Sequence, residues 1–474
     1  MSRRRQALVK DATRTAEPRR RLPRWVGPAA LLLLALLVLG WRVRAGADPF
    51  PGPSDDLVPR GVELADADNA FALLEQASSV GRNDEVEAKA ETSIWEPAYG
   101  GSEGAATRSS YMRARAGALP LVHQALSRSG IAFPPATSGK PRPDALPSGI
   151  ATLLEIASVE RSDAGDQEGA LDRCLELARL GRLLEGSGSS VFVYVRGLAF
   201  EEMGLAGIRR VVADPRPVRA AKLETTQKAL ERLEPDAAGA AESIKVEYQA
   251  YSALLDGYRH GEVAFPRLLA SCEERSAGGP VPPNEELVPV CQKLALVDAL
   301  YPRYMKPNQT QEWLAGSSRW TIERLERPPL PREEQELDKP VVAGHLDAGG
   351  TPTFGFVSDN GLGRTLHASA ITLGAHLPRL LARERTSLAI TRALVALREH
   401  RDSRGSLPAS LDELVPALLP SVPLDGLDGS PLRYSREKAI VYSIGNDRKD
   451  VGGTLPGPND SLWSLPNPAS PALR

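Results

Sequence analysis

The residues best suited to chemistry lie near the C-terminus, in the stretch YSIGNDRKDVGG at positions 442–453. It begins as a short β-type run and continues as a polar turn that holds Asp447 and Asp450 and ends on two glycines. Three interpretations fit such a loop: a metal site, a catalytic site, or a hairpin whose acidic side chains satisfy turn backbone groups. Arg448 and Lys449 stand between the two acidic residues, and their positive charges weaken the attraction for a dication.

The other residue types that could do chemistry have no recognised spacing. The histidines form no zinc-binding pattern, so we expect a structural or surface role for each. They are His123, His260, His345, His367, His376 and His400. GSGSS at 186–190 lacks the GxSxG pattern of a nucleophile elbow and is expected to end a helix, and NGLGRT at 360–365 lacks the lysine of a phosphate loop. The sequence therefore predicts no catalytic and no cofactor-binding residues.

Three cysteines are too few for a disulfide scaffold, and they form no CxxC metal pattern. In an oxidising compartment Cys272 and Cys291 are the better pair, because the Gly/Pro-rich stretch between them would let two helices return beside each other. Cys174 falls on the apolar face of a predicted helix, where we expect it to be buried.

The N-terminus contains the segment WVGPAALLLLALLVLGW at 25–41, which holds no charged residue. As a helix it spans about 25 Å, near the lower limit for crossing a bilayer. Nine Lys and Arg residues precede it, which predicts that residues 1–24 are a basic cytoplasmic tail and that the rest crosses the membrane. The alternative is a signal peptide cut after Ala47. Arg42 and Arg44, between the apolar run and that site, favour an uncleaved anchor.

The remainder of the chain divides by composition. The formal net charge of -2 shows no basic body, so nucleic acid is not an expected partner. Residues 46–62 contain four prolines and are predicted to be an extended tether between membrane and body. Residues 63–326 are predicted to be a helical domain. Residues 327–357, Pro-rich and then Gly-rich, are predicted to be a linker.

Apolar residues recur at helical spacing through much of the central part of the chain. Helices are expected over 105–129, 168–186, 191–212, 223–233 and 240–260. In the second of these, Asp172, Arg173, Glu176 and Arg182 lie mostly off the apolar stripe. A succession of helices and turns of this kind predicts an antiparallel bundle or a solenoid-like body.

The last part of the chain changes character. An amphipathic helix is expected over 377–399, followed by the helical turn LPASLDELVPALLP and the tight turn LDGLDG. Two β candidates, PLRYSR and AIVYSIG, come next. This order predicts a compact α+β module at 377–465 and a short tail at 466–474.

The segment from about 383 to 465 resembles the periplasmic domain of the major pseudopilin of bacterial type II secretion. The resemblance rests on RTSLAITRALVALREHRDSRGSLPASLDELV, VPLDGLDGSPLRYS, and VYSIGNDRKDVGG followed by NDSLWSL. It implies a pseudopilin-like module and a Ca²⁺ site with Asp447, Asp450 and Asp460 as acidic ligands and backbone oxygens near Ser443. The whole chain also resembles uncharacterised bacterial membrane-anchored proteins.

Together these patterns predict a mainly α chain with an N-terminal transmembrane helix, a helical bundle or solenoid-like body, and a small pseudopilin-like α+β module. We expect a single-pass protein of the inner or cytoplasmic membrane, with its N-terminus in the cytoplasm and its body outside. Its expected function is non-catalytic binding or assembly with a protein partner at the cell envelope. Two alternatives stay open: a divergent accessory subunit of a type II secretion or pilus-like machine, and a hydrolase whose site forms from residues distant in sequence.

Overall fold

The part of the chain described by the structure is mainly helical, as predicted. The computed structural model describes residues 47–83, 85–87, 89, 102–133, 149–233, 235, 237–263, 305–327, 360–445, 450, 452–453 and 462–464. Within these residues, none of the helices combines the length and the apolar character needed to cross a bilayer. The predicted anchor at 25–41, the linker at 327–357 except its first residue, and the tail at 466–474 lie outside the described residues.

Helices make up most of the described residues. They are α2 (Phe71–Ser79), α4 (Ser102–Arg115), α5 (Ala118–Leu126), α6 (Gly149–Asp163), α7 (Gln167–Glu185), α8 (Val191–Ala213), α9 (Ala220–Glu231), α10 (Ala237–Arg259), α13 (Pro307–Arg324), α17 (Gly361–Ala375) and α18 (Leu377–Arg404). The helices expected from 168 to 260 are confirmed as α7 to α10. The single helix expected over 105–129 is wrong: the chain breaks at 116–117 into α4 and α5, and Pro120 stands in the first turn of α5, where proline is tolerated.

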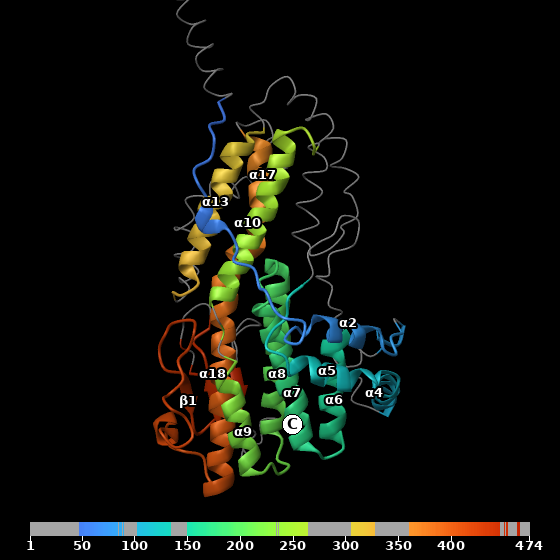
Figure 1. The fold of residues 1–474 in the computed structure, drawn as a ribbon. Coiled ribbons are helices and arrows are strands. Elements are labelled where there is room, and N and C mark those ends of the chain that lie inside the picture. The colour runs from blue at the N-terminus through green and yellow to red at the C-terminus, as the bar shows by residue number, and fades with distance from the viewer. Residues whose placement is uncertain are drawn as a thin grey trace, which may run out of the picture.

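The helices form an elongated body (Figure 1). One half holds α6, α7, α8 and α9, with α2, α4 and α5 on their flank; the other half holds α10, α13 and α17. The longest helix, α18, runs on from α17 and packs against α8 and α9. Segments that are far apart in the sequence are therefore held side by side along its length.

The contact between α7 and α8 is unusually close because glycines face each other across it. A Cβ atom on Gly181 would lie 2.4 Å from the carbonyl oxygen of Gly197 and equally close to the amide nitrogen of Glu201. Only a residue without a side chain fits there. Cys174, on the same face of α7, is buried, as predicted.

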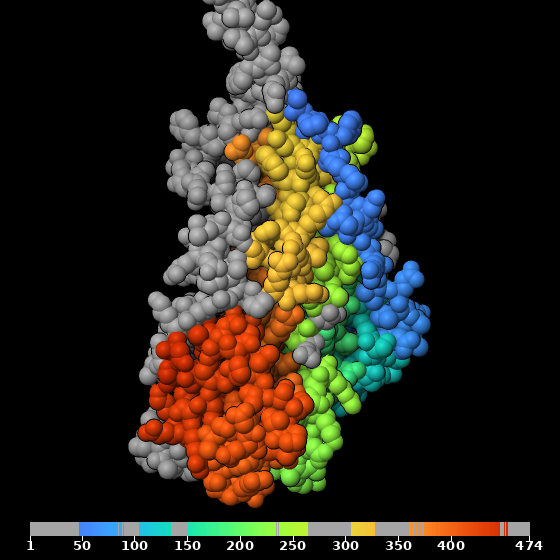
Figure 2. Space-filling model, turned by 90° about the vertical axis from the view of Figure 1, so that its left-hand side faces the viewer, coloured from blue at the N-terminus to red at the C-terminus, as the bar shows by residue number. Residues whose placement is uncertain are grey.

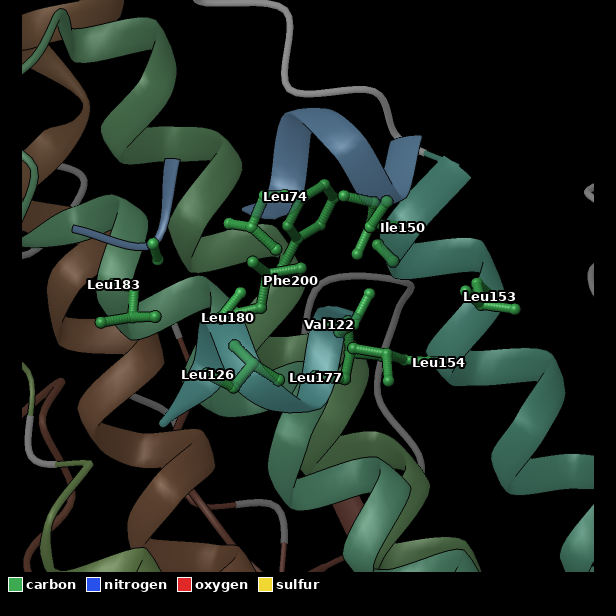
Figure 3. Packing of buried hydrophobic residues seen from close by; sticks show 14 of the residues in the cluster. Leu74, Val122, Leu126, Ile150, Leu153, Leu154, Leu177, Leu180, Leu183 and Phe200 are labelled. Carbon is green, nitrogen blue, oxygen red and sulfur yellow. The ribbon is translucent and has the colours of Figure 1, made fainter. Parts of the chain in front are cut away.

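One apolar core joins α5 and α7 to α2, α6 and α8 (Figure 3). Leu74 of α2, Val122 of α5, Ile150 of α6, Leu177 of α7 and Phe200 of α8 all belong to it. Burying a side chain of this size contributes about 2 kcal/mol. This core fixes α5 against α7.

A second core joins α18 to the same body. Leu388 and Val395 of α18 pack with Leu171 of α7 and Leu205 of α8. The predicted module at 377–465 therefore shares its first helix with the helical body, which was expected to end at residue 326.

Three short antiparallel strands follow α18. They are β1 (Arg433–Ser435), β2 (Ile440–Tyr442) and β3 (Leu462–Ser464), with β2 in the middle. The two predicted β segments are confirmed as β1 and β2, and they pair with Tyr434 opposite Val441. Figure 2 shows the C-terminal residues gathered into one rounded region at the lower end of the molecule.

The segment predicted to be a tether, 46–62, packs on the body over part of its length. The carboxylate of Asp48 accepts hydrogen bonds from the backbone N–H groups of Asn308 (3.0 Å) and Gln309 (2.9 Å) at the first turn of α13. Further on, Arg319 of α13 pairs with Asp56 at 2.7 Å. An acidic side chain on free N–H groups stabilises a helix N-terminus, which explains why this proline-rich segment is held in place.

Candidate functional site

The predicted calcium loop is described only in part. Asp447 and Asp460 lie outside the described residues. Asp450 Oδ1 accepts hydrogen bonds from the N–H of Gly452 at 2.8 Å and from the hydroxyl of Tyr442 at 3.3 Å. Where side chains are described, no three His, Cys, Asp or Glu residues come together as metal ligands. The calcium site stays a prediction. The contacts of Asp450 are those of a residue that stabilises a turn.

The predicted disulfide partners Cys272 and Cys291 also lie outside the described residues. Cys174 is buried, with its Sγ 2.9 Å from the hydroxyl of Ser158, and burial raises the pKa of this thiol to about 11. A thiol so far from ionisation is a poor nucleophile.

Most of the histidines that the structure describes have structural contacts, as expected. Nε2 of His367, which is buried, lies 2.9 Å from the hydroxyl of Ser317, and Nδ1 of His400 lies 3.0 Å from the carbonyl of Ser406. His123 differs, because it lies at the edge of a hollow lined by charged side chains.

This hollow, which we call the basic hollow, has a volume of about 490 Å³ and lies between α5, α7 and the end of α9. Its charged lining comes mainly from α7, where Arg173, Arg179 and Arg182 stand at multiples of three residues and spread over about half of the helix surface. Arg232 adds a guanidinium from the residue that follows α9. The complete lining is His123, Ser129, Asp172, Arg173, Leu175, Glu176, Arg179, Arg182, Leu183, Ala229, Arg232 and Leu233.

Positive charge is in excess in the basic hollow. Its lining has four arginines and two carboxylates, those of Asp172 and Glu176, and Glu185 behind the lining pairs with one of the arginines, Arg182. Asp172 is already paired with Lys222 of α9. Arg179 donates a long hydrogen bond of 3.4 Å to the backbone carbonyl of Arg128. Because a carbonyl is neutral, this contact does not compensate the charge of Arg179. The hollow therefore favours an anion.

The two hollow residues in closest contact are His123 and Glu176. His123 Nδ1 makes a short contact with Glu176 Oε1, and Arg173 Nη1 lies 2.7 Å from Glu176 Oε2. Arg173 Nη2 lies 3.1 Å from His123 Nε2. Arg173 Nη1 also lies 3.1 Å from His123 Nδ1. Because a guanidinium only donates, a proton on Nδ1 satisfies the contacts of Nδ1 with Glu176 and of Nε2 with Arg173 Nη2, but not this additional one. Arg173 thus holds both partners in place.

Glu176 is poised to change charge near neutral pH. Its side chain is only 17% exposed, and burial raises its pKa to about 7 against the opposing attraction of Arg173. Burial and the charge of Arg173 lower the pKa of His123. Loss of the Glu176 charge makes the hollow more positive, so its attraction for anions increases as the pH falls.

Arg182 connects the basic hollow to buried carboxyl groups behind it. Its Nη1 lies 2.9 Å from Oε2 of Glu185, which is fully buried. Glu201 of α8 and Glu384 of α18 are buried too. Burial raises the pKa of both; the negative charges of Glu185 and Glu384 add to the effect at Glu201, and those of Glu202 and Glu185 at Glu384. Burial of Glu201 and Glu384 therefore favours the neutral form of these two carboxyl groups.

A second hollow of about 640 Å³ adjoins the basic one, and we call it the apolar hollow. The two share His123 and Arg173. The remaining lining of the second comes from α4, from the turn between α4 and α5, from α5, and from α6 with the residue that follows it: Met112, Ala116, Leu119, Pro120, Ala157, Glu160, Arg161 and Ala164. Most of these side chains are aliphatic.

The sequence patterns did not predict this site. His123 was expected to be structural or surface, and Arg173, Glu176 and Arg182 were taken as the polar side of an amphipathic helix. The usable signal was the recurrence of arginine along α7, where each step of three residues shifts the position by about 60° and the arginines spread over half of the helix surface. Charge on a helix surface is ordinary, so this signal alone does not identify a site.

No protein-family model, no curated protein and no solved structure matches this chain. The pseudopilin resemblance of the C-terminal module therefore stays a prediction from the sequence.

Proposed function

We propose that this chain is a membrane-anchored, extracytoplasmic binding protein, and that the basic hollow binds an anionic group of its ligand. The observation that carries the proposal is the excess of guanidinium groups in a hollow between three helices. Guanidinium groups form two parallel hydrogen bonds to carboxylate or phosphate, and this geometry is stronger and more specific than a single contact.

The frame of the site supports a binding function. The core that includes Val122 and Leu177 holds α5 against α7, so the lining residues on these two helices do not depend on a loop for their position. Sites built on packed helices hold their side chains more tightly than sites on loops. Arg173 is further oriented by Glu176, and Arg182 by Glu185.

Residues 48–57, which follow the predicted anchor, contact α13, and this contact indicates which end of the body would face the membrane. Asp48, seven residues after the predicted anchor, is bound at the first turn of α13. In Figure 1 this end of the body is opposite the half that holds α5, α7 and α9. An anchored chain would thus present the basic hollow away from the bilayer.

Calorimetric titration of the full chain in nanodiscs with methyl phosphate tests the proposal, with empty nanodiscs as the blank. We expect saturable binding that weakens at least about ten-fold in Arg179→Ala and in Arg232→Ala, since each removes a charged donor worth roughly 1.5–3 kcal/mol. Arg113→Ala, on the exposed side of α4, is the matched control. No binding to the wild-type chain, or equal binding by all variants, contradicts the proposal.

A further inference from the structure

We infer that the ligand is a soluble single-chain amphiphile, in which a phosphate or carboxylate group is joined to an aliphatic chain. The anionic group would occupy the basic hollow and the chain would lie in the apolar hollow. This inference rests on the proposed function, because it takes the basic hollow as the site of the anion.

The two hollows are adjacent, so one ligand can occupy both. They share His123 and Arg173, so a molecule that binds these two side chains contacts the lining of both hollows. Arg173 already contacts Glu176 and His123. Glu176 lies on α7 and His123 lies on α5. One continuous ligand can therefore pass over this pair without displacing a helix.

Glu160 and Arg161, two charged residues that line the apolar hollow, already have partners within the protein. Glu160 accepts a hydrogen bond from the Arg108 side chain at 3.1 Å and another from the hydroxyl of Ser109 at 2.9 Å. Arg161 lies 2.7 Å from a carboxylate oxygen of Asp166. Neither rim charge needs a ligand, and what is left to contact one is aliphatic surface.

The break between α4 and α5 explains why this surface is open. At 116–117 the chain leaves one helix and enters the next, and the residues there are small. Leu119 and Pro120 follow directly and line the hollow with Ala116. A continuous helix over 105–129, which the sequence pattern had indicated, would not turn at this point to give the hollow its lining from both α4 and α5.

The chemistry of the two linings selects an amphiphile over a small anion. A purely hydrophilic anion would leave the aliphatic lining in contact with water, whereas each methylene group placed against it is removed from water. Full burial of two methylene groups is worth about ten-fold in affinity. Chain length is thus the variable that the structure predicts to matter.

The test compares methyl phosphate with hexyl phosphate, which share a headgroup, by calorimetric titration of the full chain in nanodiscs with empty nanodiscs as the blank. We expect hexyl phosphate to bind at least about ten-fold more tightly. Ala116→Gln, which places an amide in the apolar hollow, should reduce this ratio at least three-fold. Ala114→Gln, an exposed alanine outside both hollows, should leave the ratio unchanged.

The outcomes separate the two proposals. If methyl phosphate binds and hexyl phosphate binds equally well, the amphiphile inference is wrong and the anion site stands. If Ala114→Gln lowers the ratio as much as Ala116→Gln, the apolar hollow is not where the chain lies, and the inference is overturned. Loss of hexyl phosphate binding when the nanodiscs contain anionic lipid would also overturn it, because a membrane lipid would then occupy the site. If neither phosphate binds, the proposed function falls together with the inference.

Discussion

Arg182 Nη1 lies 2.9 Å from Glu185 Oε2, so one guanidinium both lines the basic hollow and compensates a carboxylate that is fully buried behind it. This single contact joins the surface site to the junction of α7, α8 and α18, because Glu185 in turn raises the proton affinity of Glu201 and Glu384. A change at Arg182 therefore affects both ligand binding and folding, and the two effects can be separated by experiment.

Arg182→Ala should destabilise the fold by about 3 kcal/mol, because it leaves a buried carboxylate without its partner. Denaturant unfolding measures this loss. The double variant Arg182→Ala/Glu185→Gln should recover most of the stability, since no uncompensated charge remains, while methyl phosphate binding stays weakened. Equal stability of the single and double variants would show that the ion pair does not have the role assigned to it.

Glu201→Gln should flatten the dependence of stability on pH. Burial, and then Glu185 and Glu384, raise the pKa of Glu201 well above its ordinary value of 4.5. A carboxyl group with a raised pKa contributes most below 4.5, and its contribution falls as the pH rises toward the pKa in the folded state. At pH 9 the glutamine variant should be more stable than the wild type by at least about 1 kcal/mol.

Chemical denaturation at steps between pH 5 and pH 9 measures this effect. Glu63→Gln, at an exposed position, is the matched control and should follow the wild-type curve. If Glu201→Gln runs parallel to the wild type over this whole range, Glu201 does not hold a proton in the folded state.

Helix periodicity was sufficient to predict much of this fold. Apolar spacing indicated α7, α8, α9 and α10 to within a few residues, and it indicated that Cys174 is buried. These predictions succeed because one face of each helix is buried, and burial leaves a period of 3.6 in the sequence. The contacts between elements leave no such record, and the candidate site depends on them.

The candidate site joins residues that are about 50 positions apart. His123 reaches Glu176 only because Val122 and Leu177 bury their side chains in one core, and nothing in the local sequence of either helix specifies this pairing. The buried carboxyl of Glu201 did leave a signal, since it interrupts a segment that is apolar on most sides. The break at 116–117 left no such signal, because the glycine at position 117 could equally well stand inside a continuous helix.

Asp425 should be the most sensitive acidic residue of the C-terminal module. It is fully buried, and its oxygens accept hydrogen bonds from the Thr386 hydroxyl (3.0 Å), the Arg433 guanidinium (2.9 Å) and the N–H groups of Leu427 and Ile444 (3.0 Å each). Asp425→Asn removes one acceptor oxygen and the charge that Arg433 faces. We expect a loss of about 3 kcal/mol.

Unfolding monitored by hydrogen exchange separates a local from a global effect of Asp425→Asn. The amide of Ile444 should lose protection first, because its acceptor is replaced. Asp428→Asn, which also pairs with Arg433 but is not fully buried, should cost less. A smaller loss in Asp425→Asn than in Asp428→Asn would contradict the central role of Asp425 in the turn.

Anion binding should strengthen as the pH falls through about 7. The pKa of Glu176 is raised to about 7 by burial, so below this pH the carboxyl is neutral and no longer competes with an anion for Arg173. The groups around it are His123 from α5, Asp172 and the arginines of α7, and Arg232 beyond α9; protonation of His123, whose pKa is lowered, adds charge of the same sign at lower pH. Both changes favour the bound anion.

Titration with methyl phosphate between pH 5.5 and pH 8.5 measures this dependence. The wild-type affinity should rise at least about five-fold from pH 8 to pH 6, after correction for the ionisation of the phosphate itself, and Glu176→Gln should bind at pH 8 as tightly as the wild type does at pH 6. Glu75→Gln, at an exposed position of α2, should keep the wild-type slope. If Glu176→Gln retains the full pH dependence of binding, the group that takes up the proton is not Glu176. His123→Ala in the same assay would then show whether that group is the imidazole of His123.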